Sequence, residues 1–137
     1  MNRILVDTNV FIYSIDEDSQ YFKQCNKLLL DTSLQLYTTS KNLTEFLTVI
    51  TRHPYSALTV QQAVQIISEI SSFVTILYPS PASYQILIDL LKEYQPTGLK
   101  IHDFEIAGIG IANQIKQIAT INTKDFKNVK EIELYPF

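Results

Sequence analysis

Short apolar runs alternate along the chain with longer stretches in which apolar residues recur every three or four positions. The short runs predict buried strands, and the longer stretches predict helices with one apolar face. The expected strands are residues 3–6, 36–39, 73–77, 118–121 and 132–135, the last at a sheet edge. The expected helices begin just after Asp7 and near residues 19, 40, 59, 80 and 103, and the last extends to about residue 117.

This order of elements predicts right-handed crossovers between parallel strands. The expected fold class is α/β, namely a three-layer α/β/α arrangement in which helices cover both faces of a mostly parallel five-stranded sheet. A chain of 137 residues fits one domain of ordinary size, so we expect a single domain over residues 1–137.

Capping residues support several of the expected helix starts. Ser40 or Asn42 can cap the helix that follows the second strand, and Thr59 with Gln62 forms a capping box. Ser80 precedes a proline at the first position of another helix, which is a favourable combination. The segment 95–98, Gln-Pro-Thr-Gly, is the clearest break in the chain.

Composition narrows the function only slightly. The net charge of −3 argues against a domain that binds nucleic acid through a broad basic surface. It does not exclude a nuclease, because a bound cation can supply local positive charge. The single cysteine, Cys25, is interpreted as a buried thiol. No apolar run is long enough to span a bilayer, and the first residues do not resemble a secretory signal, so we expect a cytoplasmic protein with no membrane partner.

Four acidic residues occupy positions that an α/β sheet brings to one edge. Asp7 ends the first strand, Glu45 lies about one turn into the helix after the second, Asp103 opens a late helix, and Asp125 follows the fourth strand. Ligands of such sheets bind beyond the carboxyl ends of the strands. Carboxylates that converge there repel one another, so the cluster predicts a bound cation. Oxygen ligands favour Mg²⁺, with Mn²⁺ as the alternative.

Each acid also has a structural interpretation. Asp7 and Asp103 can cap helices, because a carboxylate accepts hydrogen bonds from the free N–H groups of a first turn. Glu45 can be a solvated helix residue at the margin of an apolar face, and Asp125 can be a turn residue. These interpretations remain open for each residue considered alone.

Four segments contain these acids in a characteristic order. They are Asp-Thr-Asn-Val-Phe-Ile at 7–12, Asn-Leu-Thr-Glu-Phe at 42–46, His-Asp-Phe at 102–104 and Thr-Ile-Asn-Thr-Lys-Asp-Phe at 120–126. Together they resemble the PIN-domain family, particularly its VapC-type toxin ribonucleases. No single segment is specific, but the resemblance covers nearly the whole chain in order.

The resemblance implies a metal-dependent endoribonuclease that hydrolyses RNA through carboxylate-bound Mg²⁺ or Mn²⁺. Asp7 and Asp103 would be metal ligands, and Glu45 would complete the acidic site directly or through water. Family members carry the fourth acid at the position of either Asn122 or Asp125. Because the first of these is an amide here, Asp125 is the acidic candidate.

Further roles follow at a lower rank. Thr8 and Asn9 would orient Asp7, Thr120 would bind the phosphate or a carboxylate, and Asn122 would bind metal-bound water or substrate. Basic residues are candidates for contacts with the RNA backbone, although a solvated surface is their commoner role. These are Arg3, Lys41, Arg52, Lys100 and Lys124.

The resemblance also implies partners. VapC-type proteins are commonly homodimers inhibited by a small antitoxin, so we expect both, with RNA as the substrate. The helix from Thr59 to Ser71 and the segment Arg52 to Ala57 are candidate contact surfaces. Two other functions stay open. One is a non-catalytic PIN fold that binds RNA or protein, which Asn122 favours. The other is a receiver-like domain with Asp7 as phospho-acceptor, which the order of motifs fits poorly.

Overall fold

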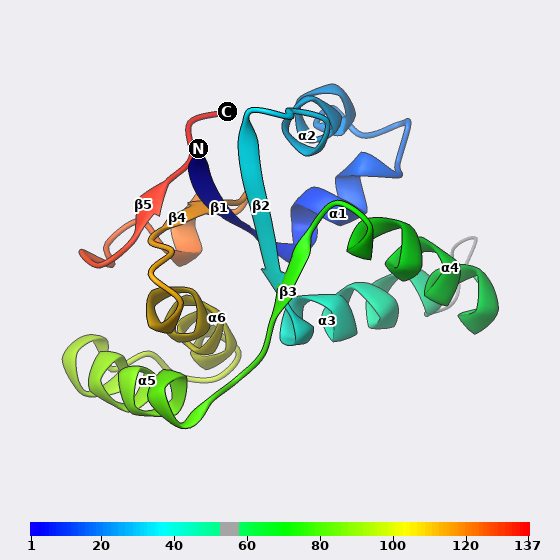
Figure 1. Cartoon of the computed structure of the whole chain (residues 1–137). Coiled ribbons are helices and arrows are strands. Elements are labelled where there is room, and N and C mark those ends of the chain that lie inside the picture. The colour runs from blue at the N-terminus through cyan, green and yellow to red at the C-terminus, as the bar shows by residue number, and fades with distance from the viewer. Residues whose placement is uncertain (53–57) are drawn as a thin grey trace.

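A parallel sheet forms the middle layer of the protein, seen in a computed structural model that describes residues 1–52 and 58–137 (Figure 1). Its strand order is β3-β2-β1-β4-β5, and each neighbouring pair is parallel. The strands are β1 (Asn2–Val6), β2 (Leu34–Thr39), β3 (Thr75–Leu77), β4 (Gln117–Ala119) and β5 (Glu133–Leu134). The expected three-layer α/β/α fold with a five-stranded sheet is confirmed, and the sheet is parallel throughout.

Helices cover both faces of the sheet. The helices are α1 (Thr8–Ser14), α2 (Phe22–Leu29), α3 (Ser40–Thr51), α4 (Val60–Ser71), α5 (Pro81–Tyr94) and α6 (Lys100–Ala112), with a short 3-10 turn at Thr123–Asp125. The strand β1 shows how the two layers are separated. Ile4 and Val6 join a core with residues of α1 to α4, whereas Leu5 joins a second core with residues of α5 and α6. Alternate side chains of a strand point to opposite faces, so each face has its own core.

The start of α3 differs in detail from the expectation. Neither Ser40 nor Asn42 is the N-cap, because Thr39 at the end of β2 takes that position. The Thr39 hydroxyl accepts a hydrogen bond from Asn42 N at 3.1 Å, and the Asn42 side chain accepts one from Thr39 N at 3.3 Å. The strand therefore passes into the helix without a loop, and Asn42 is fixed at its third position.

The helix α6 lies several residues earlier than expected. It begins at Lys100, after Gly98 with a φ of 63°, and ends at Ala112, before Gln114 with a φ of 58°. The left-handed conformation at Gln114 ends the helix without the glycine that usually marks such a position. Asp103 therefore lies within the first turn of α6, and Leu99 is the N-cap, which has no side-chain capping bond. The interpretation of Asp103 as a helix cap was wrong.

The other elements follow the expected pattern. Thr59 and Ser80 cap α4 and α5 as predicted. The helix α2 begins at Phe22 rather than near residue 19, and β3 begins at Thr75 rather than at Phe73. Cys25 is fully buried, and loss of solvent raises the pKa of its thiol to about 11, in agreement with an inert role. Among the described residues, no helix has the length and apolar character needed to cross a bilayer.

Close packing of α5 against α6 fixes the helix that carries Asp103. A Cβ atom added at Gly108 would lie 3.1 Å from the backbone oxygen of Ser83 and 3.4 Å from Leu87 N. We expect Gly108→Ala to lower the free energy of unfolding by about 1–2 kcal/mol, because the clash with backbone outweighs the helix propensity gained by alanine. Urea denaturation would measure the change. Ser68→Ala on the exposed side of α4 is the control for propensity alone, and a stabilised Gly108→Ala variant would contradict the close approach.

Candidate active site

Asp7 lies between the end of β1 and the start of α1 and is 7% exposed. Its Oδ1 accepts hydrogen bonds from Thr8 N at 2.9 Å and Asn42 Nδ2 at 3.1 Å. Its Oδ2 accepts from Thr120 Oγ1 at 2.8 Å and Asn9 Nδ2 at 3.4 Å. A carboxylate offers about four lone-pair positions, so these donors satisfy it. Asp7 is thus a helix N-cap, as one interpretation held, and also the centre of a polar network.

Asn42 is a member of this network that the sequence analysis did not assign to the site. It is fully buried, and each of its two side-chain polar atoms takes part in two hydrogen bonds. The Oδ1 atom accepts from the backbone and the hydroxyl of Thr39, and Nδ2 donates to Asp7 and to Thr8 Oγ1 at 3.0 Å. The amide therefore joins the start of α3 to the carboxylate at the end of β1. The signal that could have found it is an asparagine three residues after a threonine at a strand end.

Thr8 connects Asp7 to Glu45. The Thr8 hydroxyl lies 3.2 Å from Glu45 Oε2 and 3.3 Å from Asn42 O, and it can donate to either acceptor. Glu45 is exposed, one turn into α3, so its carboxylate reaches back over the end of β1 while remaining accessible to solvent. Thr8 occupies the bridging position between the buried and the exposed acid.

Asn9 and Thr120 hold the other side of Asp7. Asn9 Nδ2 donates to Thr120 Oγ1 at 3.0 Å, and Asn9 Oδ1 accepts from Ile121 N at 3.1 Å. Thr120 Oγ1 also accepts from Asn122 N at 3.1 Å. These bonds attach the segment after β4 to the start of α1. The side chain of Asn122 is exposed and makes no capping bond to the 3-10 turn that follows.

A cleft of about 600 Å³ lies beside this network, between α3 and α6. Glu45, Asp103 and Asp125 line it, together with Lys41, Lys100 and the exposed His102. Asp7 lies behind Glu45 and is buried. The structure thus brings all four predicted acids to one region, from four separate parts of the chain.

The charges of these acids interact. Burial raises the pKa of Asp103 to about 7, and the negative charges of Asp125, Asp7 and Glu45 add to the shift. Burial also raises the pKa of Asp7, with Glu45 and Asp125 acting in the same direction, although hydrogen bonds from Thr120 and Thr8 oppose it. Carboxylates show such shifts when they are close and no cation neutralises them.

The donor chemistry of this cluster fits a hard divalent cation. Each candidate ligand is a carboxylate, amide or hydroxyl oxygen, which suits Mg²⁺ or Mn²⁺. However, within residues 1–52 and 58–137 no group of three acidic, histidine or cysteine side chains lies close enough to hold a metal ion. Mg²⁺ usually keeps several of its waters and binds through one or two carboxylates, so this separation is compatible with it.

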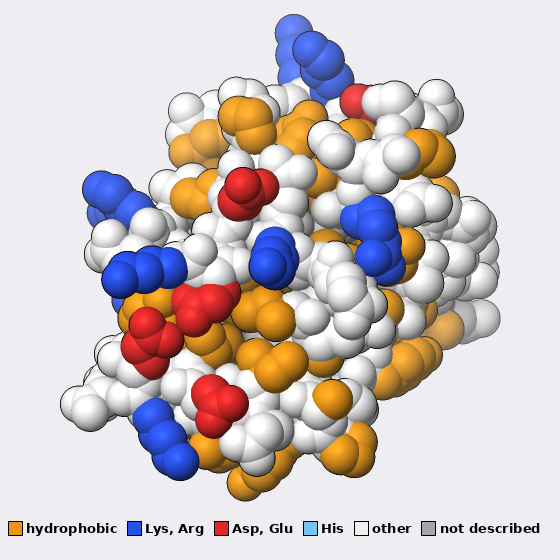
Figure 2. All heavy atoms as spheres, turned by 60° about the vertical axis from the view of Figure 1, so that its left-hand side comes forward, with side chains coloured by type: hydrophobic (Ala, Val, Ile, Leu, Met, Phe, Trp, Pro, Cys, Tyr) orange, Lys and Arg blue, Asp and Glu red, His pale blue; other side chains and the backbone are white. Residues whose placement is uncertain are grey.

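Positive charge reaches the cleft from two helices. Lys41 of α3 forms an ion pair with Glu105 of α6 at 3.4 Å, and Lys100 lines the cleft without contributing to that pair. Acidic, basic and apolar side chains are interspersed over the face that carries α5 and β5 (Figure 2).

Arg3 does not belong to this site. It lies near the start of β1, at the opposite end of the strand from Asp7. Its guanidinium is 5.0 Å from the centre of the Tyr37 ring, and it also donates to Gln114 O at 3.5 Å. Arg3 therefore lies away from the four acids, and a contact between Arg3 and the RNA backbone stays a prediction. Its side chain is exposed near the amino end of β1, far from the carboxyl edge of the sheet where Asp7 lies.

These features define a class of protein. It is an α/β domain whose parallel sheet is covered by helices on both faces and whose acidic cleft lies beyond the carboxyl ends of the central strands. The chain belongs to the PIN domain family, whose model matches residues 4–132. A search of curated protein sequences finds no significant match.

Several solved toxin structures share this fold. A VapBC2 structure from Rickettsia felis, bound to a promoter DNA fragment, has a TM-score of 0.75 at 19% identity and covers 98% of both chains. VapC20 from Mycobacterium tuberculosis, described as a toxin that cleaves the sarcin-ricin loop, has a TM-score of 0.73 at 12% identity over 92% of this chain and 95% of its own. A DNA-bound VapBC structure from Salmonella typhimurium has a TM-score of 0.68 at 21% identity, and the match covers 98% of both chains.

Removing the Asn42 amide should weaken the fold around Asp7. We expect Asn42→Ala to lower the free energy of unfolding by about 3 kcal/mol, because buried partners on Asp7 and Thr39 lose their hydrogen bonds. Asn113→Ala is the matched control, since that amide donates one bond to Ile109 O and should cost about 1 kcal/mol. Equal losses for the two variants, measured by urea denaturation, would contradict a central role for Asn42.

The metal-free protein should be less stable at high pH. The pKa of Asp103 is raised in the folded state, so the folded protein binds more protons than the unfolded chain between about pH 4 and pH 7. The free energy of unfolding should therefore fall as pH rises through this window. Urea denaturation with EDTA at pH 5 and pH 8 would measure it. Asp103→Asn should reduce the difference, whereas Asp89→Asn on α5 should not, and an unchanged pH dependence in Asp103→Asn would refute the assignment.

Proposed function

We propose that this protein is a metal-dependent endoribonuclease, the toxin of a toxin-antitoxin pair. The observation that carries the proposal is the gathering of Glu45, Asp103 and Asp125 in one cleft near the buried Asp7, where burial and the neighbouring charges raise the pKa of Asp103 to about 7. A cluster that repels phosphate serves hydrolysis of a phosphodiester only when a cation neutralises it. VapC20, which shares the fold, is described as cleaving a ribosomal RNA loop.

Asp7 and Asp103 are the proposed metal ligands, with Glu45 and Asp125 at the same cleft. Bound Mg²⁺ or Mn²⁺ would polarise the phosphate and lower the pKa of a water molecule. Asp7 would bind the ion either through water or directly, in exchange for its longest hydrogen bond, the 3.4 Å contact with Asn9. The network around Asp7 would orient this carboxylate for the ion, and the hydrogen bonds from Thr120 and Thr8 act against the effect of burial on its pKa.

The remaining residues would position water and substrate. Glu45 is exposed in the cleft and tied to Thr8, so it is the proposed group that orients or deprotonates the attacking water, with Asp125 as the alternative. Lys100 and Lys41 line the same cleft and are the proposed contacts for the RNA phosphates. Asn122 projects into solvent beside Thr120, where its amide can bind water or substrate.

The similarity to the VapBC structures also supports proposals about partners. Structures with this fold include VapBC toxin-antitoxin complexes, so we propose a small antitoxin that covers the acidic cleft. We also propose a homodimer in the cytoplasm. Val60 and Val64 on α4 are 69% and 54% exposed, which gives this helix an apolar outer surface suited to contact with a second copy. Residues 53–57 of the other candidate surface lie outside the described part of the chain.

A second function is favoured by one observation. Within the described residues, no three acidic, histidine or cysteine side chains form a metal-binding group. A PIN domain that binds RNA or protein without cutting it would need no such group. Asn122, an amide where some family members have an acid, favours the same alternative.

Removal of the acids should abolish cleavage while keeping the fold. We expect the wild type to cut a mixed panel of single-stranded and structured RNAs with Mg²⁺ or Mn²⁺ and to be inactive with EDTA. Asp7→Asn and Asp103→Asn should reduce the cleavage rate by at least about 100-fold, because each removes a charge that holds the cation. Gel analysis of labelled RNA would measure the rates, with Asp89→Asn as the control.

Metal binding itself gives an independent readout. Mg²⁺ should raise the melting temperature of the wild type at pH 8 more than that of Asp103→Asn, because an ion that binds only the folded state stabilises it. Cleavage that survives EDTA and both substitutions would overturn the proposed mechanism. A folded, antitoxin-free protein that binds RNA without cutting it would favour the non-catalytic function.

A further inference from the structure

A second cavity lies on the other side of the segment that carries Asn122 and Asp125. It measures about 430 Å³, and it is separate from the acidic cleft. Its lining comes from α2, from the residues after β4 and from the end of the chain. The residues that matter below are Tyr21, Gln24, Thr120, Thr123, Tyr135 and Phe137. The chain end and α2 lie at the same side of the molecule (Figure 1).

Three of the nine residues that line this cavity are aromatic: Tyr21, Tyr135 and Phe137. Tyr135 and Phe137 stand edge to face with ring centres 5.4 Å apart, and Phe137 is 45% exposed. On the opposite wall Tyr21 packs against Tyr13 at 5.0 Å, which fixes its ring. Tyr21 and Tyr135 are partly buried in the core formed with α1 to α4. The cavity therefore offers rings held in place by packing, which lowers the entropy cost of stacking a planar ligand on them.

The cavity is continuous with the acid network through Thr120. This residue lines the cavity, and its hydroxyl donates to Asp7 Oδ2 at 2.8 Å. The residues that follow separate the two hollows: Thr123 lines the aromatic cavity, and Asp125 lines the acidic cleft. Between them Lys124 is exposed. A nucleic-acid backbone crossing from one hollow to the other would pass over a lysine and the exposed amide of Asn122.

We propose that the aromatic cavity binds one unstacked base of a single-stranded RNA segment next to the bond placed in the acidic cleft. The inference rests on the proposed function, because the RNA substrate of the acidic cleft is the molecule that would reach both hollows. Rings that stack on a base, and the amide of Gln24 and hydroxyl of Thr123 that can bond to its edge, are the groups that recognise single-stranded RNA.

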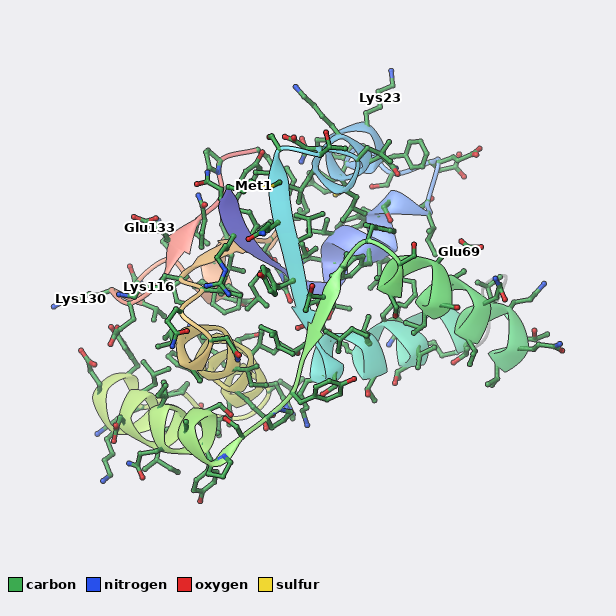
Figure 3. The ribbon with its side chains drawn as sticks, in the orientation of Figure 1. Met1, Lys23, Glu69, Lys116, Lys130 and Glu133 are labelled. Carbon is green, nitrogen blue, oxygen red and sulfur yellow. The ribbon has the colours of Figure 1, made fainter. Side chains whose placement is uncertain are left out.

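The size and charge of the cavity agree with this occupant. Its volume lies within the range of about 300–1,000 Å³ that is usual for small-ligand sites, and one base fits such a space. No side chain among the described residues that line the cavity is charged, so a neutral base suits these side chains better than a phosphate. Lys23, which precedes Gln24 on α2, points outward into solvent (Figure 3).

A titration of the wild type with each of the four nucleoside 5′-monophosphates, without metal and in EDTA, tests base binding directly. We expect the ring signals of Tyr21 and Tyr135 to shift in NMR spectra and those of Tyr84 to stay in place. Tyr84 is 63% exposed on α5 and lines neither hollow. This readout needs no catalysis, so it separates failure of the inference from failure of the proposed nuclease function.

Substitutions test whether the cavity contributes to binding of RNA. Tyr135→Leu should weaken binding of a labelled single-stranded RNA decamer, measured by fluorescence anisotropy in EDTA, by about tenfold, the effect of losing one base–aromatic stack. Tyr135→Phe should retain the affinity, because it keeps the ring. Tyr84→Leu is the matched control. Circular dichroism would establish that the variants are folded, and Gln24→Leu, on the surface of α2, gives a second test with little risk to the core.

Three outcomes would overturn the inference. The first is an absence of ring shifts with all four nucleotides. The second is RNA affinity that is unchanged in Tyr135→Leu and Gln24→Leu while the wild type still cleaves RNA. The third is ring shifts that depend on protein concentration alone, which would assign the cavity to contact between copies of the chain.

Discussion

The buried carboxylate of Asp7 is the constraint on which the rest of the site depends. A charge in this position is costly unless hydrogen bonds satisfy it, and here the donors come from α1, α3 and the segment after β4. Each donor belongs to an element that must be placed correctly for the bond to form. The cost of the charge is therefore offset by the contacts that align the carboxyl ends of β1, β2 and β4, and the candidate active site is also a junction of the fold.

Electrostatics and packing act in opposite directions at this junction. The two cores on either side of the sheet bring α3 and α6 together over the end of β1, and this approach forces Glu45, Asp103 and Asp125 towards Asp7. Burial is the main cause of the raised pKa values of Asp7 and Asp103, and the neighbouring negative charges add to both shifts. A fold that stores repulsion in this way gains the most from a bound cation, since the ion removes the penalty as well as adding its own bonds.

The sequence predicted the parts of this arrangement that depend on local pattern. Asp7 after a buried strand, and Glu45 one turn into the next helix, were placed correctly because strand and helix periodicity is strong there. The end of α6 was predicted at the wrong residue, because the left-handed residue that stops the helix is Gln114 rather than a glycine. The role of Asn42 was also missed. Its bonds reach Asp7, 35 positions earlier in the chain, and periodicity carries no signal for such a contact.

The strand order explains why the aromatic cavity reaches the hydrogen-bond network of Asp7 at Thr120. The chain fills the sheet outward from β1 through β2 to β3, then returns to place β4 on the other side of β1. Crossovers diverge at this reversal, and ligands of parallel sheets bind in the crevice that it leaves. Asp7 ends one strand at the reversal and Thr120 follows the other, joined by a 2.8 Å hydrogen bond. A substrate of the proposed acidic site would therefore lie close to the aromatic cavity, whose rings come from Tyr21, just before α2, and from Tyr135 and Phe137 after β5.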